Sequence, residues 1–169
     1  MSEKSDRQNT TKWYDGFFYN KVITPLEGEI MTLVDELIPI GSTVIDIGCG
    51  PGSLVLKLST KCKKVTGVDI SNRMIAYANK QKEKMQTTNV TFICEDASTM
   101  GTTHDEKFSF ATICMCLHGM SWKTRQDVIE NCFSLSQRVI LADFISPFPK
   151  NIFGAGQHST GTANGPAAD

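Results

Sequence analysis

Short runs of apolar and β-branched residues recur along this chain of 169 residues, and amphipathic helical patterns separate them. Strands that alternate with helices indicate right-handed βαβ units, which build a parallel sheet covered on both faces. The pattern therefore predicts an α/β fold. The expected strands are 43–47, 65–68, 90–94, 108–116 and 138–142, and the expected helices between them are about 53–60, 72–85 and 122–134.

Two further helices are predicted before the first strand. Segment 13–23 carries aromatic and aliphatic residues at helical spacing, and Thr24-Pro25-Leu26-Glu27 is a capping box with proline at the first helical position. Pro39 and Gly41 end the second helix. Its expected apolar stripe is Ile30, Val34, Leu37 and Ile38.

A glycine-rich loop follows the first predicted strand directly. The chain leaves the strand through Gly48-Cys49-Gly50-Pro51-Gly52 and enters a helix at once. Glycine permits φ above zero, and the absent Cβ lets a ligand touch the backbone. Dinucleotides and nucleosides with an amino-acid tail both use such a loop. The dinucleotide fingerprint requires Gly or Ala at position 53, where this chain has Ser53.

Three aspartates stand at the ends of predicted strands. The carboxylate of Asp69 can accept hydrogen bonds from the ribose hydroxyls of either ligand class. Asp96 can accept from the exocyclic amine of an adenine, and Asp46 faces the place where an ammonium group would rest. Each also has a structural interpretation: Asp69 and Asp96 as helix caps or turn residues, and Asp46 as a strand-end acid.

Three stretches now carry a resemblance to a known family. "VIDIGCGPGSL", "VTGVDIS" and "CEDAS" resemble, in order and spacing, the first three motifs of class I S-adenosylmethionine-dependent methyltransferases. The resemblance covers roughly residues 13–150. The stretch "WYDGFFYN" is similar to the aromatic lid segment of the small-molecule branch that includes the ubiquinone and menaquinone biosynthesis methyltransferases. The resemblance implies a Rossmann-like, doubly wound sheet.

It also implies an enzyme that moves a methyl group from S-adenosylmethionine to a small-molecule acceptor by in-line SN2 transfer, with S-adenosylhomocysteine as product. Gly48, Gly50 and Gly52 would shape the loop around the methionine portion, and Asp46 would hold its amino group directly or through water. The other residues that the resemblance places around the cofactor are Cys49, Asp69 at the ribose, Ile70 on the adenine, Met74, Asp96 and the Ala97 amide at the adenine amine, Cys114 and Leu117.

Catalytic candidates are fewer. The resemblance places His118 near the sulfonium, and Tyr14 and Tyr19 could form a lid that excludes water. The alternative interpretations are a loop histidine with satisfied hydrogen bonds and two ordinary packing tyrosines. Methyl transfer asks little of side chains, because the cofactor carries the activated group.

Composition and charge exclude several other classes. The net charge is −1 and the pI is about 6.3, so no basic face indicates nucleic acid. No apolar run reaches the ~18 residues that span a bilayer, and the polar N-terminus lacks a signal-peptide core. The six cysteines form no CxxC pair, which predicts core thiols, no metal site and a reduced, cytoplasmic protein.

The end of the chain departs from the family pattern. The family sheet has seven strands, the last two forming a hairpin, and "GAGQHSTGTANGPAAD" cannot form one. We therefore expect a cofactor-binding domain over 1–153, with a polar segment over 1–12, and a flexible tail over 154–169. Strand 138–142 would keep an open edge, which predicts self-association along it or reduced stability.

Two alternative functions remain open from the sequence. One is a cofactor-binding protein without transferase activity, which the missing hairpin motivates. The other is a nicotinamide-dependent oxidoreductase, which Ser53 and the Asp96 motif oppose. The acceptor cannot be read from the chain, because it has neither an Asn-Pro-Pro-Tyr motif nor a basic face for RNA. A small organic acceptor is the default.

Overall fold

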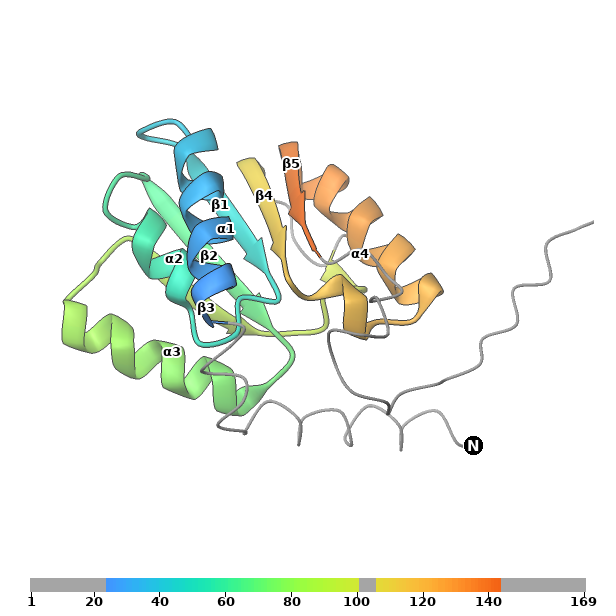
Figure 1. Cartoon of the computed structure of the whole chain (residues 1–169), viewed down its shortest axis with the longest axis horizontal. Coiled ribbons are helices and arrows are strands. Elements are labelled where there is room, and N and C mark those ends of the chain that lie inside the picture. Colours follow the sequence, from blue (N-terminus) through green and yellow to red (C-terminus); the bar gives the residue numbers. More distant parts are fainter. Residues whose placement is uncertain (1–23, 101–105, 144–169) are drawn as a thin grey trace, which may run out of the picture.

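A computed structural model describes residues 24–100 and 106–143 of the chain (Figure 1). Within these ranges the strands form one five-stranded sheet in the order β3-β2-β1-β4-β5, and every neighbouring pair is parallel. The predicted α/β fold is confirmed. The strands are β1 Thr43–Ile47, β2 Lys64–Asp69, β3 Val90–Cys94, β4 Phe108–Cys114 and β5 Ser136–Ala142. The helices are α1 Thr24–Leu37, α2 Ser53–Leu58, α3 Asn72–Met85, the 3-10 turn η4 Leu117–Gly119 and α4 Trp122–Leu135.

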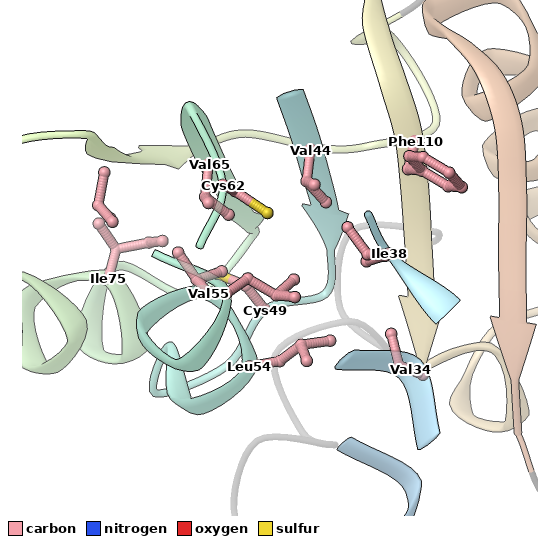
Figure 2. Close-up of a cluster of buried hydrophobic side chains, with 12 residues drawn as sticks. Val34, Ile38, Val44, Cys49, Leu54, Val55, Cys62, Val65, Ile75 and Phe110 are labelled. Atoms are coloured by element: carbon pink, nitrogen blue, oxygen red, sulfur yellow. The ribbon is translucent and has the colours of Figure 1, made fainter. Parts of the chain in front are cut away.

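Helices cover both faces of the sheet. Because successive side chains of a strand point to opposite faces, Val44 of β1 joins one buried cluster and Ile45 joins the other. The first cluster packs β1, β2 and β4 against α1, α2 and α3, and Figure 2 shows Val44, Val65 and Phe110 within it. The second cluster packs the opposite face against α4. The sheet is therefore doubly wound.

The ends of three strands differ from the prediction. Strand 65–68 is one residue longer at each end, because β2 spans Lys64–Asp69. Strand 108–116 was predicted too long, because β4 ends at Cys114, where Met115 takes the left-handed conformation with φ 56°. Strand 138–142 was predicted too short, because α4 runs directly into β5, which begins at Ser136. Neither the turn after β4 nor the passage from α4 into β5 is marked by glycine or proline.

The predicted stripe of α1 is partly wrong. Val34 and Ile38 are buried, and Ile30 packs against the same cluster, as expected. Leu37, however, is 63% exposed, and Met31 packs against the cluster instead. The last turn of α1 therefore presents a narrower apolar face to the sheet than the spacing indicated.

Several expectations lie outside the described residues. They are the helix predicted over 13–23, the lid residues Tyr14 and Tyr19, the polar segment 1–12 and the tail 154–169. Within the described ranges β5 pairs only with β4, so the expected open edge is present there. Self-association along that edge stays a prediction.

A glycine in the middle of β2 fits where no side chain can. A Cβ at Gly67 would lie 2.8 Å from the Phe92 ring and 2.9 Å from a methyl group of Val55. Gly67→Ala should therefore lower the free energy of unfolding by about 1–3 kcal/mol, because overpacking forces the core apart. Denaturant unfolding measures this loss.

The matched control is Gly119→Ala, since a Cβ at Gly119 has nothing within 4 Å. This variant should unfold within about 1 kcal/mol of the wild-type protein. Equal stability of the two glycine variants would contradict the packing of Phe92 and Val55 over β2.

Candidate functional site

The strand order reverses between β1 and β4. From β1 the chain moves outward through β2 to β3, then crosses back to β4 on the other side of β1. In open parallel sheets, ligands bind outside the carboxyl ends of the strands at such a reversal of strand order. The glycine-rich loop leaves β1 at this edge, and η4 follows β4 there. The candidate site therefore lies at this edge.

The backbone of the glycine-rich loop requires glycine at three positions. Gly48, Gly50 and Gly52 have φ values of 70°, 53° and 85°, which side chains rarely adopt. The amides of Gly48 and Cys49 both donate to the Val68 carbonyl, at 2.8 and 3.0 Å. The loop is thereby fastened to the end of β2.

The three glycines differ in what surrounds them. A Cβ at Gly48 would lie 2.6 Å from the Cβ of Cys116, and one at Gly52 would lie 2.6 Å from the Phe92 ring. These two glycines are required by packing against the protein itself. A Cβ at Gly50 would have nothing within 4 Å. Gly50 is thus the glycine of this loop whose backbone faces open space, where a ligand can approach.

Asp69 ties the glycine-rich loop to β2. Its Oδ2 accepts from the Gly50 amide at 2.9 Å, and its Oδ1 accepts from the Ser71 amide at 2.8 Å. A carboxylate has about four lone-pair positions, so two backbone donors leave capacity for ribose hydroxyls. The structural and the ligand interpretations of Asp69 are therefore compatible.

Asp46 is a buried carboxyl group in the middle of the sheet. It is 3% exposed, and the Thr112 hydroxyl of β4 donates to its Oδ1 at 2.6 Å. Burial raises the pKa of Asp46 from 3.8 to about 7; the Thr112 hydrogen bond opposes this rise, and the charge of Asp69 adds to it. A nearby cation would favour the ionised form, so the site suits a ligand with an ammonium group.

The loop after β3 combines a turn with a tether to α4. The Oδ1 of Asp96 accepts from the Ser98 amide at 3.0 Å and from its hydroxyl at 2.7 Å. The Ala97 carbonyl accepts from the Asn131 side chain of α4 at 2.9 Å. The turn interpretation of Asp96 is therefore confirmed.

The remaining predicted cofactor residues occupy different depths. Ile70, after β2, is exposed, and Met74 is half-buried in the first turn of α3. Leu117 is buried in the second core cluster. Of these residues, Ile70 therefore presents the most side-chain surface to a ligand.

Three cysteines stand in or beside the glycine-rich loop and at the end of β4. Burial, followed by the charge of Asp46, raises the pKa of Cys114 to about 12 and raises the pKa of Cys49 and Cys116 as well. These thiols therefore stay protonated near neutral pH and do not supply thiolate nucleophiles. All six cysteines are free. The prediction that all are core residues is wrong for Cys94, whose side chain is exposed at the end of β3.

His118 contacts an aspartate that the sequence analysis missed. Its Nδ1 lies 2.7 Å from Oδ1 of Asp143, and its backbone amide donates to Oδ2 of Asp143 at 3.0 Å. Asp143 follows β5 directly, as Asp69 ends β2, so the signal was an acid at the carboxyl end of a predicted strand. The guanidinium of Arg125 donates to the His118 carbonyl at 3.1 Å and holds η4 in place.

Two kinds of feature are absent from the part of the chain that the structure describes. Residues 24–100 and 106–143 contain no group of three or more His, Cys, Asp or Glu side chains that could hold a metal ion. The described helices also include none with the length and apolar character needed to cross a membrane.

Comparison with known proteins adds to this geometry. The methyltransferase domain family matches residues 44–138, which is more than half of the chain. The chain is 42% identical over 77 residues to the (S)-tetrahydroprotoberberine N-methyltransferase of Eschscholzia californica, covering 43% of this chain and 22% of that protein. It is 33% identical over 95 residues to a ubiquinone biosynthesis O-methyltransferase of Coxiella burnetii, covering 56% of this chain and 39% of that protein.

The fold has a counterpart among solved structures. The structure of magnesium protoporphyrin IX methyltransferase from Synechocystis PCC 6803 with bound SAH aligns with a TM-score of 0.63 at 24% identity. The alignment covers 79% of this chain and 66% of that one. The chain spans less than half the length of the curated relatives named here.

Proposed function

Because the chain belongs to the methyltransferase domain family, we propose that it is an S-adenosylmethionine-dependent methyltransferase that acts on a small-molecule acceptor. The observation that carries the proposal is the glycine-rich loop after β1. There the Gly50 amide donates to the Asp69 carboxylate, and a Cβ at Gly50 would meet no other described residue within 4 Å. The N- and O-methyltransferases among the relatives support a small organic acceptor.

The residues at this edge of the sheet fit this cofactor. A methionine portion would lie against the Gly50 backbone, since a side chain there would occupy its space. The buried Asp46, whose pKa is raised by burial, would be stabilised in its ionised form by the cofactor's ammonium group, directly or through water. Asp69 would accept from the ribose hydroxyls, while Asp96 and the Ala97 amide would meet the adenine beside Ile70.

The chain's own residues have a limited task in the reaction. When bound, S-adenosylmethionine supplies an electrophilic methyl group, and its sulfur keeps the electron pair of the broken carbon–sulfur bond. The protein must hold the acceptor atom in line at about 3 Å from the methyl carbon and exclude water. The half-buried Cys114 and the buried Leu117, at the end of β4, would form an apolar wall beside this position. Tyr14 and Tyr19 are proposed as its lid.

We propose a cofactor-binding domain over 1–153 and a cytoplasmic location, which the free cysteines favour. We also propose that copies of the chain associate along the outer edge of β5, whose partner within the described residues is β4 alone. Sedimentation at increasing protein concentration tests this association.

Calorimetric titration tests the proposed function. S-adenosylmethionine and S-adenosylhomocysteine should both bind, and NAD should bind at least ~100-fold more weakly, since Ser53 stands where the dinucleotide loop needs Gly or Ala. Tighter binding of NAD would contradict the proposal and favour an oxidoreductase. A chain that binds S-adenosylmethionine without transferring its methyl group to any acceptor would be a binding protein.

A further inference from the structure

A threonine hydroxyl is buried in β4, where the neighbouring positions of the strand are apolar. Thr112 is 0% exposed, as are Ala111 and Ile113 on either side of it. Valine is close to threonine in size and would fill the position without a polar atom, whereas a buried hydroxyl without a hydrogen bond costs free energy. The hydroxyl of Thr112 is therefore explained by the group that it binds.

That group is the carboxyl group of Asp46. Asp46 and Thr112 stand opposite each other in the parallel pair of β1 and β4, and the hydroxyl donates to Oδ1 of Asp46 at 2.6 Å. Among the residues that the structure describes, Thr112 is the one hydrogen-bond partner of the Asp46 side chain. A carboxylate has about four lone-pair positions, so Oδ2 is left for a donor that the described residues do not supply.

The surroundings of Asp46 favour a positive charge at that second oxygen. Burial raises the pKa of Asp46 to about 7, the Thr112 hydrogen bond opposes this rise, and the charge of Asp69 at the end of β2 adds to it. Burial, followed by the charge of Asp46, raises the pKa of four thiols, which are Cys49, Cys114, Cys116 and Cys132. The described groups that interact with the charge of Asp46 are thus one acid and protonated thiols. A ligand cation would supply the opposite charge.

We propose that Thr112 is a positioning residue for the cofactor: it holds the Asp46 carboxylate by Oδ1 and thereby presents Oδ2 to the ammonium group of S-adenosylmethionine. The inference rests on the proposed function, which assigns that ammonium group to Asp46. The hydroxyl acts in two ways, because it fixes the rotation of the carboxylate and, as a donor, favours the ionised form that an ammonium group requires. Thr112 touches neither the reacting atoms nor the cofactor and acts through Asp46.

This role makes Thr112 a determinant of ligand specificity. S-adenosylhomocysteine carries the ammonium group, and methylthioadenosine has the same nucleoside and sulfur without the amino-acid portion. Both ligands use the ribose and adenine contacts, and the first alone uses Asp46. The ratio of their affinities therefore reports how well the carboxylate is presented.

Calorimetric titration of Thr112→Val with these two ligands tests the inference. Binding of S-adenosylhomocysteine should weaken about 10–100-fold, which is the effect expected when a hydrogen bond to a charged group is lost. Binding of methylthioadenosine should change less than ~3-fold, because this ligand makes no contact with Asp46. Thr112→Ala, which also lacks the hydroxyl but places less bulk in the sheet, should show the same difference between the two ligands.

Two matched variants separate the hydroxyl from the packing of the strand. Thr112→Ser keeps the hydroxyl and loses a methyl group, so it should bind both ligands within ~3-fold of the wild-type protein. Thr66 of β2 is a second buried threonine, 3% exposed, and it pairs with Ile45 in place of Asp46. Thr66→Val should leave both affinities unchanged within the same limit.

A double-mutant cycle shows whether Thr112 acts through Asp46. In an Asp46→Asn background, Thr112→Val should weaken binding of S-adenosylhomocysteine by less than ~3-fold further, because the carboxylate that it positions is gone. A loss as large in this background as in the wild-type protein would overturn the inference.

The ligand titrations can also contradict the inference in other ways. An equal loss of both ligands in Thr112→Val and Thr112→Ala, or no loss of either, would overturn the role of Thr112. A loss of S-adenosylhomocysteine binding in Thr112→Ser as large as in Thr112→Val would overturn it as well, since the hydroxyl is then not the cause. A wild-type protein that binds neither ligand would contradict the proposed function itself.

Discussion

Gly50→Val is expected to abolish measurable binding of S-adenosylmethionine while the protein stays folded. The branched side chain would project away from the glycine-rich loop, where a Cβ would meet no described residue within 4 Å other than its chain neighbours. We expect a loss of affinity of at least ~100-fold, because the cofactor and the side chain cannot occupy the same volume. Calorimetry measures the affinity, and circular dichroism checks the fold.

Gly41 offers a matched control for the backbone cost of this change. It also has a positive φ, 80°, and a Cβ there would likewise have nothing within 4 Å. Gly41 precedes β1, at the opposite edge of the sheet from the candidate site. Both valine variants should therefore lose about 1–2 kcal/mol of stability from the left-handed conformation, and only Gly50→Val should lose the cofactor. Cofactor binding by Gly50→Val at wild-type affinity would place the ligand elsewhere.

The buried Asp46 should make the free protein less stable as the pH rises. In the unfolded chain this carboxyl group loses its proton near pH 3.8, and in the folded protein burial raises its pKa to about 7. Between these values the folded state binds a proton that the unfolded state has lost, so the free energy of unfolding falls with increasing pH. The stabilisation by the protonated Asp46 carboxyl group is complete below about pH 4 and is lost as the pH rises through 7. Between these two limits the free energy of unfolding falls by roughly 4 kcal/mol.

Asp46→Asn separates this effect from other titrating groups. The asparagine oxygen can still accept from Thr112, and the side chain does not ionise. Denaturant unfolding at pH 5 and pH 8 should show a smaller loss of stability in the variant than in the wild-type protein. The variant should also be the more stable of the two at pH 8. Equal pH dependence of both proteins would contradict the burial of an ionisable group at this position.

Cofactor binding should act on the same carboxyl group in the opposite direction. An ammonium group near Asp46 favours the ionised form and lowers its pKa, so binding near neutral pH should release a proton. Titrations in two buffers of different ionisation enthalpy measure that release. It should be absent in Asp46→Asn.

Much of the fold follows from local sequence signals. The β-branched runs at β1 and β3 are separated by helices with clear starts, such as α3 behind Ser71, whose hydroxyl caps the Met74 amide. The glycine-rich loop was equally readable, because three left-handed positions leave little choice of residue. The end of β4 was not readable, because Met115 turns the chain in a conformation that methionine seldom adopts. The start of β5 was not readable either, because α4 runs directly into the strand at Ser136.

The sequence predicted the site residues that stand at recognisable positions near the glycines, but not the contacts between residues far apart in the chain. Asp69 and Asp46 stand in recognisable positions relative to the glycines, and the structure places them at the same edge of the sheet. Their interactions with Thr112 and with the Gly50 amide required the strand order, since Thr112 is 66 residues from Asp46. Asp143 was missed for the same reason, because β5 must lie next to β4 before the carboxylate can meet His118.

The most direct test of the account is the location of the cofactor on the chain. A ¹⁵N-labelled sample titrated with S-adenosylmethionine should show its largest amide shifts at Gly50 and the residues around it, and next at Asp69, Ala97 and His118. Gly41, at the opposite edge of the sheet, should not shift. Shifts centred at that opposite edge, or a glycine-rich loop that does not respond at saturating cofactor, would contradict a binding site at the carboxyl ends of β1 and β4.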